Sequence, residues 1–451
     1  MSNIIDEGEY KMARRTRKRK SKKSNRIVYI LSLILLLLLI LDGFAVKDWL
    51  SENRQNKEKL PVAASPNDSG TTLQTEDSSD VVKEDVISTK EVSLMAVGDN
   101  LIHTAVWQSG LQPDGTHDYT LLYSDLAPYL ETCDLKVINQ ETIFGGDEKG
   151  LRDYPVFNSP EAIGDTLEEV GFNVVLHASN HGFDMGLDGL LNCVSFWKTS
   201  HPAMTVLGIY ETREEQSQIP VLEINGIKFA LLNYTYSHNA ETFSTKAEGH
   251  LNMLCNYDAN SRYIDFNTIH PQVLDDIRRA ESMADFTIVF PHWGIEYTME
   301  ATAQEITFAS QMAEAGADLI IGTHPHVIQP VEWVTADNGN RALCYYSLGN
   351  YTSAQDGVAQ MLGGMANLTI VQDESGTYIR EDSIKAIPLV THFIYPGWTG
   401  SSVVESTYLL EHYTEEQAAG HGLRNAWGIV LTKDELLSLA QDTFGEYLSM
   451  E

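Results

Sequence analysis

Seven short apolar runs divide the chain, and six of them are followed by Asp, Glu, Asn or His, usually beside a glycine. The runs are rich in β-branched and aromatic residues, and each is short enough to form one strand. They occupy residues 92–97, 135–138, 173–176, 228–233, 286–290, 319–321 and 343–348. Helical segments lie between several of them. Strands that alternate with helices predict an α/β architecture with much parallel sheet.

The helical segments begin and end at recognisable capping residues. They run from Ser159–Pro160 to Gly171, from the capping box Thr302–Glu305 to Gly316, and from Thr432–Glu435 towards Tyr447. With 43% hydrophobic residues, the chain can bury a substantial core. We therefore predict one folded body over residues 91–451, with a helical extension at its C-terminal end.

The first part of the chain has a different composition. Residues 1–26 carry ten Lys and Arg against three acidic residues, and an unbroken apolar run of fifteen residues follows at 27–41. Extended to residue 46, the run is long enough to cross about 30 Å of hydrocarbon. The preceding positive charge would hold that end in the cytoplasm. We predict a cytoplasmic tail over 1–26 and a transmembrane anchor over 27–46, with a cleaved signal peptide as the alternative.

Residues 47–90 are polar and lack apolar periodicity, which predicts a flexible stalk with the body, 91–451, outside the cell membrane. The whole chain has a net charge of −32, and without the basic tail the remainder carries −39. So acidic a body excludes nucleic acid and anionic lipid as partners, and its membrane contact is expected through its own helix alone.

The four cysteines have no spacing typical of a metal site. Outside the membrane they have the capacity for two disulfides. However, Cys344 lies inside an apolar run, which favours buried free thiols for at least some of the four.

The polar residues that follow the apolar runs are the candidate functional residues. In open α/β sheets the carboxyl ends of parallel strands meet at one edge, where ligands bind. Carboxylate, amide and imidazole ligands without thiolate suit Mn²⁺, Fe or Zn²⁺, as one or two ions. The alternative for the His324–His326 pair is a polar loop without metal. The candidates are Asp99, Glu141, Asn180, His181, Asp184, His292, Glu296, His324, His326 and Asn350.

Six motifs in this order resemble the CapA family of capsule and poly-γ-glutamate synthesis proteins. They are Gly-Asp, Asn-x-Glu, Ser-Asn-His-Gly-Phe-Asp, His-Trp-Gly-x-Glu, Gly-x-His-Pro-His and Ser-Leu-Gly-Asn, spread over about residues 92–390. That family belongs to the calcineurin-like metallophosphoesterase superfamily. The resemblance implies a four-layer αββα sandwich with a metal centre at the strand ends. The transmembrane helix predicted before it, with the body outside, also fits this family.

The resemblance also implies roles for individual residues. Asp99 and His326 match ligands of a first metal, and Glu141 matches a carboxylate that bridges two metals. The ligands of the second metal are matched by Asn180, His292 and His324. The catalytic residue is matched by His181, which protonates the leaving oxygen and binds no metal.

One position departs from the superfamily's opening Asp-x-His motif, because Leu101 stands where a second ligand of the first metal is expected. His103, four residues after Asp99, is a candidate replacement. Asp184, Glu296 and Asn350 are further candidates for the site.

Three functions follow as hypotheses. The first is a membrane-anchored, metal-dependent hydrolase or transferase of capsule, poly-γ-glutamate or envelope-polymer synthesis. The second is a non-enzymatic, polymer-binding assembly factor of the capsule machinery, and the third is an extracellular phosphoesterase. The expected partners are an anionic capsule or envelope polymer and other membrane proteins of capsule synthesis. Divalent ions would have to mediate the polymer contact, since the acidic body repels an anionic chain at long range.

Overall fold

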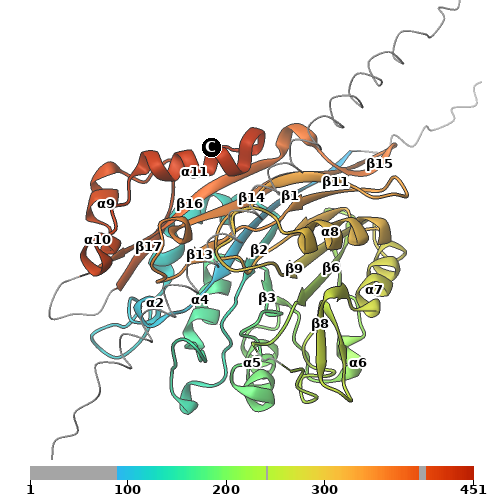
Figure 1. The fold of residues 1–451 in the computed structure, drawn as a ribbon, viewed down its shortest axis with the longest axis horizontal. Helices are drawn as coiled ribbons and strands as arrows, with labels where there is room; N and C mark the ends of the chain where they lie inside the picture. The colour runs from blue at the N-terminus through green and yellow to red at the C-terminus, as the bar shows by residue number, and fades with distance from the viewer. Residues whose placement is uncertain (1–88, 240–241, 396–402) are drawn as a thin grey trace, which may run out of the picture. The chain divides into compact units, whose positions relative to one another are not determined.

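The computed structural model describes residues 89–239, 242–395 and 403–451. The predicted tail and anchor, and all but the end of the predicted stalk, lie outside these residues, so their boundaries stay predictions. Within the described ranges, no helix has the length and apolar character needed to cross a membrane. Two mixed sheets with helices around them make up the described part, which confirms the predicted mixed α/β class (Figure 1).

The larger sheet has nine strands, and its central strands are parallel. β1, β2, β3 and β4 pair in parallel, while β14, β16 and β17 continue the sheet in antiparallel pairs on the other side of β1. β13 pairs with the end of β1, and β15 pairs with β14. The strands are β1 (Lys90–Asn100), β2 (Leu135–Asn139), β3 (Val174–Leu176), β4 (Thr205–Leu207), β13 (Asn350–Thr352), β14 (Leu362–Asp373), β15 (Gly376–Ile379), β16 (Lys385–Ile394) and β17 (Val403–Leu409).

The second sheet has six strands in the order β11-β12-β10-β9-β6-β5. Its four inner strands are parallel, and β5 and β11 are antiparallel edge strands. A separate hairpin, β7-β8, follows β6. The bounds are β5 (Val221–Ile224), β6 (Ile227–Thr235), β7 (Cys255–Asp258), β8 (Tyr263–Ile269), β9 (Phe286–His292), β10 (Leu319–Ile321), β11 (Val331–Thr335) and β12 (Arg341–Tyr345).

Helices cover the sheets and connect their parallel strands. α7 packs against β6 and β9, and α8 against β11 and β12. The C-terminal helices lie beside β16 and β17 in Figure 1. The helices are α2 (Thr104–Trp107), α3 (Ala127–Thr132), α4 (Ala162–Val170), α5 (Gly186–Ser200), α6 (Arg213–Gln216), α7 (Pro271–Glu281), α8 (Ala303–Ala315), α9 (Glu415–Gly420), α10 (Gly422–Trp427) and α11 (Lys433–Phe444), with 3₁₀ turns at Thr120–Leu126, Asp147–Lys149, Ala359–Met361, Glu381–Ser383 and Gly445–Tyr447.

The predicted helix ends are confirmed with small shifts. Gly171 and Gly316 both adopt the left-handed conformation that ends a helix, and both halves of the Thr302–Glu305 capping box are formed. α4 begins at Ala162, two residues after Pro160, because the Pro160 carbonyl accepts from the Ile163 amide in a tight first turn. The last helix ends at Phe444, and a 3₁₀ turn carries the chain on to Tyr447.

The two sheets share one hydrophobic core. Side chains also tie them directly: the Tyr345 hydroxyl in β12 donates to the Lys385 carbonyl in β16 over 2.9 Å. All four cysteines are buried and free, as expected for at least some of them. Strands β1 and β2 of one sheet and β9 of the other end in Asn100, Asn139 and His292, all three buried.

Gly322 follows β10, and the residues that directly follow β12 and β9 approach its backbone closely. A Cβ at this position would lie 2.0 Å from the Tyr346 carbonyl oxygen and 2.4 Å from the Trp293 indole nitrogen. Those two atoms form a hydrogen bond of 2.9 Å that runs past the glycine.

We expect Gly322→Ala to destabilise the protein by about 2 kcal/mol or more, because the backbone must move and the buried hydrogen bond lengthens. The urea midpoint of unfolding measures this loss. Gly420→Ala is the matched control, since a Cβ there meets nothing within 4 Å. Equal midpoints for the two variants would contradict the prediction.

Candidate metal centre

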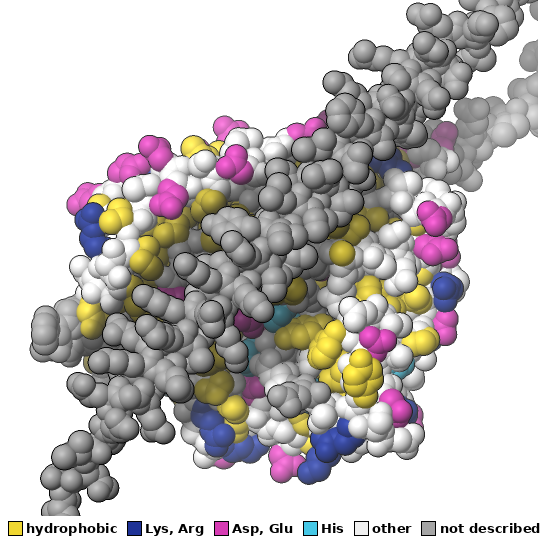
Figure 2. Space-filling model, viewed as in Figure 1, with side chains coloured by type: hydrophobic (Ala, Val, Ile, Leu, Met, Phe, Trp, Pro, Cys, Tyr) yellow, Lys and Arg dark blue, Asp and Glu magenta, His cyan; other side chains and the backbone are white. Residues whose placement is uncertain are grey.

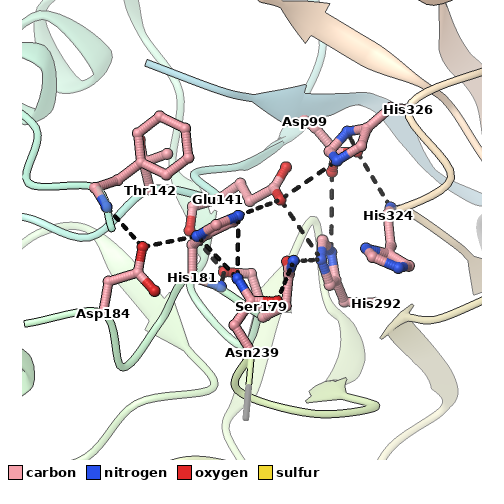
Figure 3. Close-up of polar contacts among 12 residues, drawn as sticks. Asp99, Glu141, Thr142, Ser179, His181, Asp184, Asn239, His292, His324 and His326 are labelled. Carbon is pink, nitrogen blue, oxygen red and sulfur yellow. Dashed lines mark hydrogen bonds and ion pairs between the residues drawn. The ribbon is translucent and has the colours of Figure 1, made fainter. Parts of the chain in front are cut away.

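Glu141 lies at the middle of the candidate site. It follows β2, is 0% exposed, and neither of its carboxylate oxygens has a hydrogen-bond partner among the described residues. Its Oε1 atom lies 3.8 Å from His292 Nε2, 3.8 Å from His326 Nε2 and 4.0 Å from His181 Nε2 (Figure 3). Burial raises the pKa of Glu141 well above its ordinary value, and the charge of Asp99 adds to the rise.

Buried polar atoms are almost always partnered, because leaving them without a partner costs about 1–3 kcal/mol or more. A carboxylate with two unpartnered oxygens, surrounded by imidazole nitrogens, is therefore a place where a cation fits. A second unpartnered atom supports the same conclusion, since buried His324 Nδ1 also has no partner in the described ranges. Glu141, His324 and His326 each offer one ligand atom within 4.8 Å of the others.

The loop after β10 turns both of its histidines inward. His324 and His326 are 2% exposed and adopt positive φ angles of 102° and 58°, which are costly for residues other than glycine. Two contacts with other segments hold this conformation. The His324 amide donates to Asp99 Oδ2 over 3.1 Å, and the Tyr297 amide donates to the Pro325 carbonyl over 2.7 Å.

The orientation of His326 is set by two oxygens on its Nδ1 side. Asp99 Oδ2 lies 3.2 Å from Nδ1, and Asn350 Oδ1 lies 3.0 Å from it. The Nδ1–H group therefore donates to these oxygens, and Nε2 faces Glu141. Burial lowers the pKa of His326, but the Glu141 and Asp99 carboxylates outweigh it and raise the pKa to about 9.

Asp99, at the end of β1, is held by three donors. Its Oδ1 accepts from Asn139 Nδ2 over 2.7 Å, and its Oδ2 accepts from the His324 amide and faces His326 Nδ1. In this arrangement Asp99 orients the histidine loop. Asn350 has the same effect on His326, and its own Nδ2 donates to the His326 carbonyl over 3.3 Å.

His292, at the end of β9, faces an amide oxygen. Its Nε2 lies 2.7 Å from Asn180 Oδ1, and its Nδ1 lies 2.9 Å from Thr323 Oγ1. Burial lowers the pKa of His292 well below its ordinary value, and the neighbouring imidazoles lower it further. The ring is thus neutral, which is the form that binds metals.

His181 is paired with a carboxylate on the side away from Glu141. Its Nδ1 lies 2.7 Å from Asp184 Oδ2, and the same oxygen accepts from the Phe157 amide over 2.7 Å. Asp184 therefore orients His181 and is not part of the central cluster. The Phe157 ring packs edge-on against the imidazole, with ring centroids 4.7 Å apart.

The remaining candidates lie further from Glu141. Glu296 is exposed, and its charge reaches the site as a minor contribution that raises the pKa of both Glu141 and His326. Leu101 is buried at the position of the missing ligand. Burial lowers the pKa of His103 to about 4, and its Nδ1 accepts from the Ala354 amide over 3.2 Å.

Sequence reasoning assigned no role to three residues of the site. Asn139 belongs to the Asn-x-Glu motif and Thr323 to the Gly-x-His-Pro-His motif, so the sequence already marked both positions as neighbours of candidate site residues. Asn239 has no such signal, since it comes from the segment after β6. Its Nδ2 lies 3.1 Å from His181 Nδ1 and 3.2 Å from His181 Nε2, and its Oδ1 accepts from Asn180 Nδ2 over 3.0 Å.

On the face shown in Figure 2, histidine and acidic side chains come to the surface together near the middle, beside hydrophobic side chains. The fold and the cluster define a class: a mixed α/β protein, consistent with a metallophosphoesterase-like domain, with a buried Glu/His/His group able to hold a metal.

The family model described as "Bacterial capsule synthesis protein PGA_cap" matches residues 93–355, and the chain belongs to this family. The match spans every candidate from Asp99 to Asn350 and confirms the resemblance found in the motifs. The chain is 28% identical over 244 residues to "Capsule biosynthesis protein CapA" of Bacillus anthracis, covering 52% of this chain and 54% of that one. It is 27% identical over 190 residues to "PGA biosynthesis protein CapA" of Bacillus subtilis (strain 168), covering 42% and 44%.

The chain thus spans about half the length of these curated relatives. Among solved structures, TT1561 of Thermus thermophilus matches 61% of this chain and 93% of its own, with 9% identity and a TM-score of 0.30. That likeness is too low to carry an argument about the site.

Proposed function

We propose that this protein is a membrane-anchored, metal-dependent hydrolase or transferase that acts in the synthesis of a capsule, poly-γ-glutamate or another envelope polymer. The observation that carries the proposal is the buried carboxylate of Glu141, whose two oxygens lack partners and face imidazole nitrogens. Membership of the PGA_cap family supports the link to capsule synthesis. We also propose that its fold is the four-layer αββα sandwich of the metallophosphoesterase superfamily.

The donor set suits Mn²⁺, Fe or Zn²⁺ as one or two ions. Glu141, His324 and His326 would hold the metal, with His292 and Asn180 as further ligands on the His292 side. Asp99 is either a ligand or the residue that orients His326. When bound, the metal would supply Lewis acidity and an acidified water.

The chain's own residues would handle the proton. His181 Nδ1–H donates to Asp184, so a proton given to the substrate must come from Nε2, on the side that faces Glu141. In hydrolysis, the oxygen of water bonds to the phosphorus or carbonyl carbon of the substrate. The bond to the leaving atom breaks, the Nε2 proton passes to that atom, and the proton that the attacking water loses restores the one on Nε2. Phe157 packs against the ring and fixes its plane.

A non-enzymatic assembly factor is the second candidate. It is favoured by Leu101, which replaces a ligand of the first metal in the superfamily pattern. In either case, we propose that residues 27–46 anchor the protein in the cell membrane with the body outside. The proposed partners are an anionic capsule or envelope polymer, met through divalent ions, and other membrane proteins of capsule synthesis.

Metal content tests the proposal. We expect the full-length protein, purified in detergent without chelator, to contain one or two equivalents of Mn, Fe or Zn by elemental analysis. The double variant His324→Ala/His326→Ala should contain none. His412→Ala, an exposed histidine outside the site, is the control and should keep the metal.

Absence of metal from the unsubstituted protein, even after incubation with Mn²⁺, Fe²⁺ and Zn²⁺, would refute the metal-dependent enzyme and favour the assembly factor. Metal with turnover of simple phosphodiesters and no effect on the polymer would favour the extracellular phosphoesterase.

A further inference from the structure

We propose that Tyr154 and Tyr297 form a subsite that holds a sugar ring of the substrate beside the metal centre, so that the polymer on which this protein acts contains sugar residues. The inference rests on the proposed function, since it takes the ring to belong to the substrate of the Glu141 site. It narrows the substrate class, which the proposed function leaves open between poly-γ-glutamate and other capsule polymers.

Tyr154 lies close to the proposed general acid. It comes from the segment between β2 and α4, and its ring centroid lies 6.4 Å from that of Phe157. The Phe157 ring packs in turn against His181 at 4.7 Å, so one buried ring separates Tyr154 from the catalytic imidazole. Tyr154 itself is 73% exposed, which leaves most of its surface free to contact a ligand.

Tyr297 lies on the other side of the site, beside His326. The ring centroids of these two residues are 6.1 Å apart, and Tyr297 is 52% exposed. His181 and His326 both approach Glu141 Oε1 within 4.0 Å, and Figure 3 shows them on either side of this carboxylate. Because Tyr154 lies near His181 and Tyr297 near His326, the two exposed tyrosines flank the metal centre.

Carboxylates and an amide surround the Tyr297 hydroxyl. Gln355 Nε2 donates to this hydroxyl over 3.4 Å. Burial raises the pKa of Tyr297 to about 12, and the charges of Glu296, Tyr154 and Asp356 raise it further. Charges act strongly only over short distances in water, so these groups lie near one another. Glu296 and Asp356 are both exposed, which gives the subsite an acidic edge.

The backbone of Tyr297 is strained. Its φ angle of 64° lies in the left-handed region, which is unfavourable for an aromatic residue, and its amide donates to the Pro325 carbonyl over 2.7 Å. The ring is half exposed, so burial of the ring offsets little of this strain. Strained residues cluster at positions that contact ligands, which supports a binding role for Tyr297.

Aromatic rings also line the third side of the site. Tyr236 packs against His324 with ring centroids 4.5 Å apart, and Phe266 lies 6.1 Å from Tyr236 and is 39% exposed. Sites for small ligands are lined mainly by aromatic and apolar side chains with a few polar groups among them. The surroundings of the Glu141 cluster have this composition.

A sugar ring fits this combination of groups. It presents an apolar C–H face, which packs on a tyrosine ring, and hydroxyl donors at its edge, which the carboxylates of Glu296 and Asp356 accept. A γ-glutamyl residue has no ring, and the same two carboxylates repel its own carboxylate. A nucleobase has a flat face but carries few donors for an acidic edge.

Calorimetry on the Zn²⁺-loaded full-length protein in detergent tests the proposal. The probes are tetrasaccharides of glucose, galactose and N-acetylglucosamine, a γ-glutamate tetramer, and the bases adenine and uracil. The variants are Tyr154→Ala, Tyr297→Ala and the corresponding phenylalanine substitutions. Tyr378→Ala is the matched control, because Tyr378 is 41% exposed but lies in β15, where its hydroxyl donates to Asp373 over 2.7 Å.

We expect at least one tetrasaccharide to bind. Its affinity should fall about three- to tenfold in Tyr154→Ala and in Tyr297→Ala, as for the loss of one aromatic contact, and should largely remain in the phenylalanine variants. Tyr378→Ala should leave the affinity unchanged. The Tm of each variant, measured on the same samples, shows that a loss of affinity does not come from unfolding.

Three results would overturn the proposal. The first is tyrosine-dependent binding of the γ-glutamate tetramer or of a base in place of the sugars, which would assign the subsite to another class of ligand. The second is binding of a tetrasaccharide with the same affinity in both alanine variants. The third is no binding of any probe.

The metal content of the unsubstituted protein separates this inference from the proposed function. A protein that holds no metal but binds a tetrasaccharide through the two tyrosines would refute the metal-dependent enzyme and keep the sugar subsite, as part of an assembly factor. A protein that holds metal and binds no tetrasaccharide would refute the subsite alone.

Discussion

Glu141→Gln is expected to weaken metal binding by about two to four orders of magnitude, equivalent to the 3–5 kcal/mol typical of removing one partner from a buried charge pair. The substitution keeps the shape of the side chain but replaces an anionic oxygen by an NH₂ group, which faces the histidines and repels a cation. Glu141 Oε1 lies within 4.0 Å of three imidazole nitrogens. Among the described residues, no other carboxylate lies so close to three histidines.

The measurement is thermal unfolding with and without added Zn²⁺ or Mn²⁺. A ligand that binds only the folded state stabilises it by about 2.7 kcal/mol at 100 times its dissociation constant. The unsubstituted protein should show a rise in Tm on adding metal, and Glu141→Gln should show none at the same concentration.

Glu305→Gln is the matched control, because Glu305 is also 0% exposed but lies in the capping box of α8. It should change the Tm without metal and keep the rise on adding metal. An equal rise in both variants would show that Glu141 holds no metal.

His181→Ala is expected to lower the turnover of a phosphodiester probe by about 10²- to 10⁴-fold, the usual contribution of a general acid, while metal content stays the same. The separation of the two effects follows from the geometry. His181 lies outside the Glu141–His324–His326 group, and its Nδ1 is committed to Asp184 over 2.7 Å. Steady-state rates on the metal-loaded protein, with elemental analysis of the same samples, measure both effects.

Asp184→Asn is the companion variant, since it keeps a side chain of the same shape and removes the charge that orients His181. Its turnover should fall about 10- to 100-fold, the range for residues that position a catalytic group. A loss of metal together with turnover in His181→Ala would make His181 a ligand. Normal turnover in His181→Ala would remove it from the chemistry.

The sequence predicted the mixed α/β class and the edge of the site because both depend on local patterns. Strand-like runs that end in polar residues must bring those residues to the same edge of a parallel sheet. His292 at the end of β9 and the inward-facing His324 and His326 after β10 agree with that rule within one sheet. Glu141 follows β2 of the other sheet, so the site joins the strand ends of two sheets and not one edge, and only the tertiary structure shows this. The helix ends at Gly171 and Gly316 were equally predictable, because a capping residue acts on its own turn.

Contacts between segments that are distant in the chain decide the roles of Asp184, Asn239 and Gly322. The sequence alone could therefore not predict these roles. Asp184, a further candidate for the site from the Ser-Asn-His-Gly-Phe-Asp motif, contacts His181 and the Phe157 amide. Asn239 reaches His181 from the segment after β6, where no pattern marks it. Gly322 is required by the carbonyl of Tyr346 and the indole of Trp293, which approach it from the segments after β12 and β9.

The sequence by itself determined which residues stand at the strand ends. Apolar runs that form strands, and capping residues that end helices, are both patterns within a few neighbouring residues. Only the tertiary structure decided which nitrogen of each histidine is free. His326 turns Nε2 to Glu141 because Asp99 and Asn350 take its Nδ1, and His181 turns Nε2 to the same carboxylate because Asp184 takes its Nδ1. Each of these ring nitrogens is taken by a partner that folding brings to it. For His326, which follows β10 of one sheet, that partner is Asp99 in β1 of the other sheet.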